Sequence, residues 1–240
     1  MAITAVAATK GTASSGTSVT LTALAATAGN ALLVGGSGYE NGVTGQTLTV
    51  TRTGDTYTTD TQGDTSAATD LQRIGIASAP NVVAGPTNLV VTVSSAAGVV
   101  AFALEVAGLP ASSIRDAASP AIKIGTSTSG STNTLTNVTS DAIFVVYCGT
   151  EAGGTVTFTP GGSWTETVGG TTMNEKNAAS FPAGGFSYQI VSSTGAQAGA
   201  WTLGSADWGG LIAVYRGTVP SSVPVGTPTW DFPHPPMRTF

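Results

Sequence analysis

Residues 87–108 read TNLVVTVSSAAGVVAFALEVAG and contain the two patterns of apolar residues from which most of this chain is built. In residues 87–95 apolar and polar residues alternate, which is typical of a strand with one buried face and one exposed face. Residues 99–108 form an almost continuous apolar run, which is typical of a central strand covered on both faces. We therefore predict one strand of each kind in this stretch.

Both patterns recur along the chain, and no segment shows the sustained apolar spacing of a helix. The 32 glycines would also weaken any helix that contained them, by about 1 kcal/mol each relative to alanine. We predict an all-β fold, an antiparallel two-sheet β-sandwich with the continuous runs in its core. Alternation occurs at 17–24, 46–54, 71–78, 87–95, 154–160 and 186–192, and continuous runs occur at 30–38, 99–108, 141–149 and 209–217.

The order of these patterns in the first half of the chain is echoed in the second half. We predict a weak internal repeat, with halves at about 17–108 and 131–217. Residues 111–133 between them contain the strand-like AIKIG, which is unlike a plain linker. We favour a single sandwich over residues 1–217, with two subdomains as the alternative. Matching positions lie 108 to 111 residues apart: Ala31 and Ala142, Thr47 and Thr155, Gly108 and Gly217.

The last segment, residues 218–240, differs from the rest of the chain in its high proline content. Proline removes backbone donors and favours polyproline II, so we predict an extended C-terminal arm with a rise of about 3.1 Å per residue. The aromatic and Met side chains at its end are suitable anchors for pockets on another subunit. The alternative is a terminus that folds back on its own sandwich. The predicted docking residues are Pro220, Pro224, Pro228, Trp230, Phe232, Pro233, Met237 and Phe240.

Charge is scarce, since 9% of the residues are charged against about a quarter in an ordinary soluble domain. A surface with so little charge does little to keep copies apart, which indicates that much of it lies against other protein. The eight basic residues are scattered singly, so we predict no nucleic-acid binding. No run approaches the roughly 20 apolar residues of a membrane helix, and no signal peptide is recognisable. We predict a protein made in the cytoplasm that does not enter a membrane.

The residues of the common catalytic and metal sites are nearly missing. The one cysteine, Cys148, lies in the apolar run AIFVVYCG, where we predict a small buried side chain instead of a reactive thiol. The one histidine, His234, lies among prolines, where nothing would orient it for a catalytic triad. Two such residues cannot supply the four ligands of a zinc site. We predict no metal, no cofactor and no enzymatic activity.

Aspartates gather in one Thr-rich stretch. We predict solvated loop side chains, with ligands for Ca²⁺ at a strand connection as the alternative. These residues are Asp55, Asp60, Asp64 and Asp70.

A different carboxylate, Glu105, interrupts the continuous run at 99–108. We predict that it pairs with a basic group or with backbone donors, because an unpaired buried charge would cost several kcal/mol. A glycosidase would need a second carboxylate opposite it, for which Glu151 or Glu166 could be nominated, and this is the weaker alternative.

Large aromatic side chains are concentrated in the second half of the chain. We predict that they fill the core of that half, and the alternative is a platform on which sugar rings stack. They are Trp164, Phe181, Phe186, Tyr188, Trp201, Trp208 and Tyr215.

A family resemblance rests on five stretches in succession: AGNALLVGG, GDTYTTDTQGD, APNVVAGPTNLVVTVSS, ALEVAGLPASSIRD and WTLGSADWGGLIAVYRG. This succession resembles the jelly-roll or concanavalin-like β-sandwich proteins of tailed bacteriophages. It covers about residues 17–217 as an order of strand patterns, without a diagnostic motif. The resemblance implies a jelly-roll-like fold and a structural role in the virion. The carbohydrate and metal residues of lectin-like members are not matched, so sugar binding does not carry over.

We therefore expect a non-enzymatic virion protein, above all a capsid decoration or cement protein that stabilises the shell through subunit contacts. Its partners would be the major capsid protein or tail proteins, and other copies of itself. The alternatives are a tail or baseplate protein of the same fold, and a glycan- or receptor-binding β-sandwich module.

Overall fold

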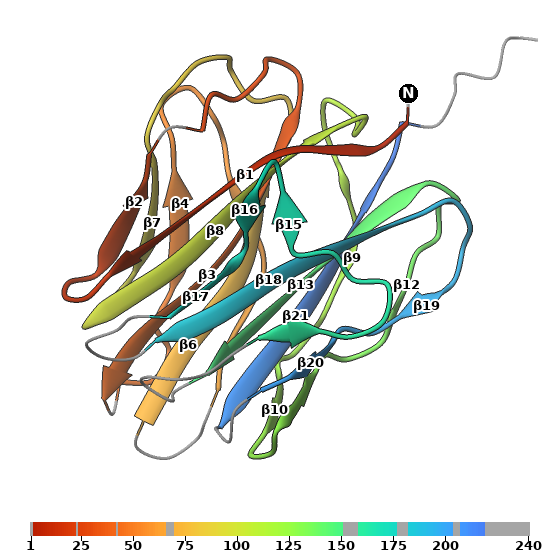
Figure 1. Ribbon diagram of the computed structural model, residues 1–240. Helices are drawn as coiled ribbons and strands as arrows, with labels where there is room; N and C mark the ends of the chain where they lie inside the picture. Colours follow the sequence, from red (N-terminus) through yellow and green to blue (C-terminus); the bar gives the residue numbers. More distant parts are fainter. Residues whose placement is uncertain are drawn as a thin grey trace, which may run out of the picture.

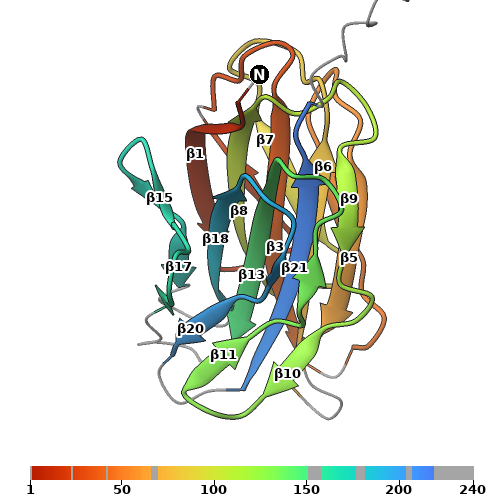
Figure 2. The same ribbon diagram turned by 90° about the vertical axis from the view of Figure 1, so that its right-hand side faces the viewer.

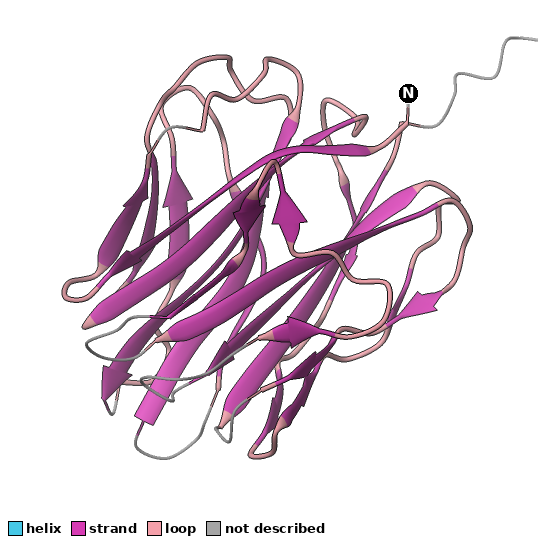
Figure 3. Cartoon of the chain, viewed as in Figure 1, coloured by secondary structure: helices cyan, strands magenta, loops and turns pink. Residues whose placement is uncertain are grey.

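The regular structure of the chain consists of antiparallel β-strands. The computed structural model describes residues 2–22, 24–41, 43–65, 70–150, 158–176, 182–203 and 207–218. These residues contain no helix (Figure 3), and their strands pair antiparallel. The predicted all-β fold is confirmed.

The first half of the chain forms one large sheet and one small sheet. The large sheet has the order β1 (Thr4–Ala13), β8 (Gly98–Ala107), β3 (Ala31–Asn41), β6 (Asp70–Ala79) and β5 (Thr58–Asp64). The small sheet, which we call the first outer sheet, has the order β2 (Ser18–Leu21), β7 (Leu89–Val93) and β4 (Leu48–Thr51).

The second half also forms one large sheet and one three-stranded sheet. The large sheet has the order β10 (Lys123–Gly125), β21 (Trp208–Arg216), β13 (Ala142–Thr150), β18 (Ala183–Val191) and β17 (Asn174–Lys176), and β9 (Arg115–Ala118) also pairs with β21. The second outer sheet has the order β11 (Ser129–Ser131), β20 (Ala200–Thr202) and β14 (Thr159–Pro160). Two short pairs complete the fold: β12 (Leu135–Thr136) with β19 (Ala196–Gln197), and β15 (Thr167–Val168) with β16 (Thr171–Thr172).

The sheets are stacked in four layers, with the two large sheets face to face in the middle (Figures 1 and 2). Neighbouring residues of a strand point to opposite faces. Phe102 of β8 therefore lies in the core between the large sheets, while Ala103 lies in the core under the first outer sheet. Tyr147 of β13 faces the middle core and Val146 faces the second outer sheet. The prediction of two sheets is thus incomplete, because each large sheet carries a further layer on its other face.

The two sequence patterns correspond to two kinds of strand only in part, because the alternating segments at 71–78 and 186–192 lie in β6 and β18, which are inner strands of the large sheets. The four continuous apolar runs form β3, β8, β13 and β21, which are central in the large sheets and buried on both faces. Three alternating segments form the first outer sheet, where buried and more exposed residues alternate along β2, β4 and β7. The segment at 111–133 contains β9, β10 and β11, which agrees with the expectation that it is no plain linker.

The middle core depends on glycines that let large side chains approach the backbone of the facing sheet. A Cβ atom at Gly35 of β3 would lie 2.6 Å from Cδ2 of Tyr147 and 2.7 Å from Cδ2 of Phe186. The ring of Phe186 stacks on that of Phe102 with centroids 6.4 Å apart. The hydroxyl of Tyr147 donates a hydrogen bond to Oγ of Ser37, at 2.6 Å. Residues of both halves thus share one close-packed core.

We predict that Gly35→Ala lowers the free energy of unfolding by about 1–3 kcal/mol, because the added methyl group overpacks the middle core. Urea titration followed by tryptophan fluorescence measures the change. The matched control is Gly195→Ala, since a Cβ atom at Gly195 meets nothing within 4 Å. The control should stay within about 0.5 kcal/mol of the wild type, and equal effects of the two substitutions would contradict the packing argument.

Candidate functional site

The residues predicted to dock on a partner, from Pro220 to Phe240, lie outside the described residues, as do Glu151 and His234. The structure does describe the residues that immediately precede this segment. The N–H of Gly217 donates to the carbonyl of Asp141 at 2.7 Å, and the N–H of Thr218 donates to the carbonyl of Gly108 at 3.0 Å. These two bonds hold the last described residues against the ends of both halves.

A hollow of about 570 Å³ lies beside Thr218, and we call it the terminal groove. Its apolar wall includes Ile3, Ile190 and Val191, and its polar wall includes Asp141, Ser192 and Thr218.

A second cleft, of about 300 Å³, lies where the edges of the two large sheets meet. Asp60 of β5 comes from the first half, and Arg115 of β9 and Tyr215 of β21 come from the second half. Oδ2 of Asp60 accepts a hydrogen bond of 2.6 Å from the hydroxyl of Tyr215, and Nη1 of Arg115 lies 3.4 Å from Oδ1. The side chain of Asp60 is 1% exposed, whereas that of Arg115 is 46% exposed and forms part of the cleft wall. Ser113 also lines the cleft and has a φ of 51°, which is uncommon for a residue other than glycine.

Burial raises the pKa of Asp60, because the carboxylate loses solvation, and the hydrogen bonds from Tyr215 and Ser78 and the charge of Arg115 offset only part of this effect. Burial also raises the pKa of the Tyr215 hydroxyl well above its usual value, and the neighbouring Asp60 carboxylate raises it further. A buried carboxyl with a shifted pKa that lines a cleft is a candidate functional group. A network that ties two sheets together produces the same shift, so the chemistry of the cleft must be tested.

The opposite edges of the large sheets are also joined by an ion pair between the halves. Nζ of Lys10 in β1 lies 2.9 Å from Oε2 of Glu175 in β17 and donates to the carbonyl of Asn174 at 3.0 Å. Together with Asp60 and Arg115, this pair places charge-assisted contacts at both sides of the middle core.

Arg52 and Asp55 form an ion pair within the first half, and their side chains are almost fully buried. Arg52 also donates to the carbonyls of Val83 and Gly85, and the N–H of Val83 donates to Asp55 at 2.9 Å. Burial, and to a smaller extent the Asp55 carboxylate, raises the pKa of the nearby Tyr57 hydroxyl. This network holds the loop after β4 against the loop after β6.

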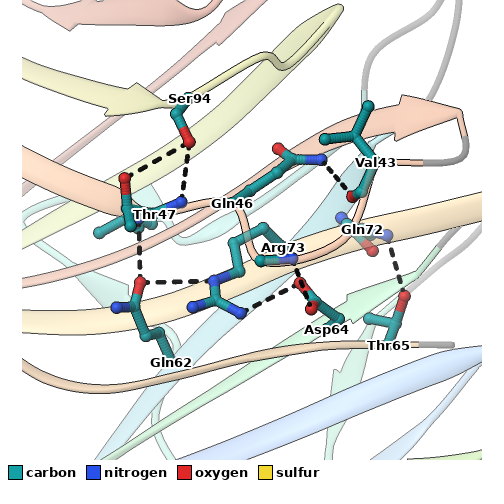
Figure 4. A network of polar contacts seen from close by, with 11 residues as sticks. Val43, Gln46, Thr47, Gln62, Asp64, Thr65, Gln72, Arg73 and Ser94 are labelled. Atoms are coloured by element: carbon teal, nitrogen blue, oxygen red, sulfur yellow. Dashed lines mark hydrogen bonds and ion pairs between the residues drawn. The ribbon is translucent and has the colours of Figure 1, made fainter. Parts of the chain in front are cut away.

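A further polar network links the first outer sheet to the edge of its large sheet (Figure 4). Nη1 of Arg73 lies 3.1 Å from Oδ1 of Asp64, and Nε of Arg73 donates to Oε1 of Gln62 at 3.4 Å. The same oxygen of Gln62 accepts the N–H of Leu48 in β4 at 3.0 Å. The role of these side chains is therefore to join two layers.

The prediction that the clustered aspartates are solvated loop residues is wrong for Asp55, Asp60 and Asp64. Each of them is at least partly buried and paired with a different arginine. For Asp60, sequence reasoning missed this because its partner, Arg115, lies in the other half of the chain, whereas Arg52 and Arg73 lie only three and nine residues from Asp55 and Asp64. The separate pairs also do not bring the three carboxylates to one point, and within the described residues no group of three or more His, Cys, Asp and Glu side chains could hold a metal ion.

Glu105 is buried, and Oε1 accepts the N–H of Thr27 at 2.8 Å and the side-chain amide of Asn30 at 2.6 Å. The predicted backbone donor is therefore confirmed, and the carboxylate anchors the loop before β3. The other described candidate, Glu166, is bonded to Asn174, and burial raises its pKa.

The predicted burial of Cys148 is confirmed, and burial raises the pKa of its thiol, which opposes formation of the reactive thiolate. The aromatic residues Phe186, Trp201, Trp208 and Tyr215 are also buried, Trp201 and Trp208 in the core of the second half as predicted, but Phe186 and Tyr215 in the middle core shared with the first half. Trp164 and Tyr188 are partly buried, and Phe181 lies outside the described residues.

No family model matches the chain, and neither a curated protein nor a solved structure shows a significant match to it. Within the described part of the chain, no helix has the length and apolar content needed to cross a membrane.

We predict that the stability of the protein falls as the pH rises from about 4 to the raised pKa of Asp60. In this window the folded state still holds a proton on Asp60 that the unfolded chain has lost, so the folded state is favoured at the acid end. The difference in unfolding free energy between the wild type and Asp60→Asn should change across the window and be constant above it. Urea titrations at a series of pH values measure this difference.

Tyr215→Phe serves as the second variant. It removes the hydroxyl that stabilises the ionised carboxylate, so the window should extend to higher pH. Parallel pH profiles of the wild type and Asp60→Asn would contradict the raised pKa of Asp60.

Proposed function

We propose that this chain is a non-enzymatic structural protein of a bacteriophage virion, made in the host cytoplasm, and that it serves as a capsid decoration or cement protein. Its partners would be the major capsid protein and other copies of itself. In this role the protein stabilises the shell through many modest contacts per particle, which add up through multivalency. It would require no cofactor.

The observation that carries this proposal is the placement of charge. Three aspartates and Glu105 are bonded inside the fold or at the junction of its layers. The described exterior is consequently poor in charge and rich in Thr, Ser, Ala and Gly, and such a surface has little electrostatic repulsion to keep it from other protein. Among the described residues, the exposed charged residues are Lys10, Arg115, Lys123, Asp141 and Asp207.

Strand order supports the jelly-roll part of the proposal. In the first half β1, β8, β3 and β6 are neighbours in one sheet and β2, β7 and β4 are neighbours in the other, so the chain alternates between two sheets as in a jelly roll, except that β5 joins the same sheet as β6. The second half has the corresponding order β21, β13 and β18 in its large sheet and β11, β20 and β14 in its outer sheet. We propose that the chain contains two jelly-roll units related by an internal repeat.

A tail or baseplate protein of the same fold would use the same features, since an uncharged exterior and an arm suit any shell or tube of subunits. The two roles differ only in the position of the chain on the particle. The proposal therefore includes a location that imaging can test.

We predict that gold-labelled antibodies against the chain bind over the heads of intact virions, because a decoration protein lies on the outer face of the shell. Label confined to tails would support the alternative, and unlabelled virions would overturn a virion role.

A chain that ends at Thr218 should keep its thermal unfolding temperature but lose at least about tenfold in occupancy on particles, since hot-spot anchors are removed. Normal coating by the shortened chain would contradict the docking role of the arm.

Glycan or receptor binding is the second candidate function, and the cleft at Asp60 favours it. Its wall offers an exposed guanidinium from Arg115, backed by a buried carboxylate, with hydroxyls from Thr58 and Ser113. A sugar presents hydroxyl groups that such donors and acceptors can bind.

We predict that calorimetry with host-surface polysaccharides gives no binding heat if the chain is only a structural protein. Under the second candidate function, the wild type binds and Arg115→Ala loses at least about tenfold in affinity, because a charge-assisted donor is lost. Arg115→Lys keeps the charge and separates electrostatic attraction from specific hydrogen bonding.

A further inference from the structure

The terminal groove has an apolar wall that includes one of the large apolar side chains that the described residues leave exposed. Ile190 of β18 is 42% exposed, although it lies within a long strand that pairs with β13. Beside it, Val191 and Ile3 continue the apolar wall of the groove. Its volume, about 570 Å³, falls within the range of pockets that hold small molecules, about 300–1,000 Å³. The groove is therefore large enough to receive an aromatic side chain.

The other wall of the groove carries negative charge. Asp141 has an exposed side chain and forms no ion pair with any described residue. The segment after Thr218 contains Arg238 and His234 among its aromatic and Met residues. An apolar wall with an adjacent carboxylate thus matches the chemistry of this segment, which offers apolar anchors and the guanidinium cation of Arg238.

The position of Thr218 argues against binding of the segment in the groove of its own molecule. Thr218 lines the groove, and its N–H is held by the carbonyl of Gly108. Trp230 follows twelve residues later, a distance of about 37 Å along the chain in polyproline II conformation. The intervening sequence contains Pro220, Pro224 and Pro228, and proline-rich spacers favour extended conformations. A spacer that kept this conformation would carry the aromatic anchors away from the groove at its root.

We propose that the terminal groove is the acceptor site for residues 219–240 of a second copy of this chain. The proposal deepens the structural role proposed above and rests on it for its biological purpose. Each copy then has one donor segment and one acceptor groove at the same end of the fold. Because donor and acceptor lie at the same end, two copies can exchange their segments reciprocally and close as a twofold dimer. Without reciprocal exchange the contact is heterologous and joins copies into a larger ring or an open chain.

The test is sedimentation equilibrium of the full-length chain over a wide range of concentration. The wild type should associate, and its mean mass should rise with concentration. Ile190→Lys places a charge on the apolar wall, and Trp230→Ala combined with Phe232→Ala removes two anchors. Each variant should need at least about a tenfold higher concentration for half-association, as expected when a hot-spot contact is lost. Asp141→Asn should weaken association by a smaller factor and reduce its dependence on salt.

The matched control is Ile124→Lys. Ile124 is 53% exposed and lies in β10, opposite Gly209, at the other end of β21 from the groove. This control should associate like the wild type, and thermal unfolding of Ile190→Lys and Ile124→Lys shows whether either variant loses its fold.

Mixing gives the decisive measurement. Ile190→Lys keeps its donor segment, and the Trp230→Ala, Phe232→Ala variant keeps its groove, so the mixture should form one-to-one pairs and nothing larger. A wild type that stays monomeric at every concentration, unchanged association of Ile190→Lys, or a mixture that does not pair would each overturn the proposal. If virions are labelled by antibody but substitutions in the terminal groove do not affect association, the proposed virion role stands and the acceptor role of the groove is wrong. If virions are unlabelled but these substitutions weaken association as expected, only the virion role is wrong.

Discussion

The ring of Tyr147 lies between the two large sheets, in a space that exists because Gly35 and Gly184 have no side chains. A Cβ atom at Gly184 would collide with the hydroxyl of Tyr147, and one at Gly35 would press against its ring. That hydroxyl is satisfied by Ser37, which also accepts a hydrogen bond from Gln72 at 2.8 Å. The middle core therefore combines close apolar packing with a small polar network that is paired across the two halves. Because interiors are packed as densely as organic crystals, this contact sets the distance between the large sheets.

The position of the large sheets in turn determines where charge can be placed. At one side of the stack, Lys10 meets Glu175, and at the other side Asp60 meets Arg115 and Tyr215. These contacts use charged side chains from both halves at the edges where the sheets would otherwise be open to water. The chain has few charged residues, and these contacts pair several of them, so the described exterior carries little unpaired charge.

The two ends of the described chain meet at the terminal groove, beside the junction of the halves. Gly217 and Thr218 are bonded to Asp141 and Gly108, each of which lies next to the end of a central strand of a large sheet. The same packing that stacks the sheets thus fixes the position of Thr218, from which residues 219–240 continue. A contact made by that segment would be transmitted to the core through these backbone bonds.

The sequence by itself determined that the fold is all-β and identified the four central strands that come from continuous apolar runs, but it did not indicate β1 or β5 as strands or β6 as a buried inner strand. Period-two alternation and continuous apolar runs depend only on which faces of a strand are buried, so β7 and β8 could be predicted from residues 87–108 alone. That Glu105 has a partner also followed, because an unpaired buried carboxylate is too costly, but the choice between a basic group and backbone donors did not.

Only the tertiary structure decided how the strands are shared among four layers, since alternation does not show which sheet a strand joins. It also decided that Asp60 is buried and paired, because its partners Arg115 and Tyr215 lie 55 and 155 residues away in the sequence. Pairing over such distances depends on the stacking of the two halves, which no local pattern encodes. The same holds for the terminal groove, whose walls come from both ends of the described chain and from the strands between them.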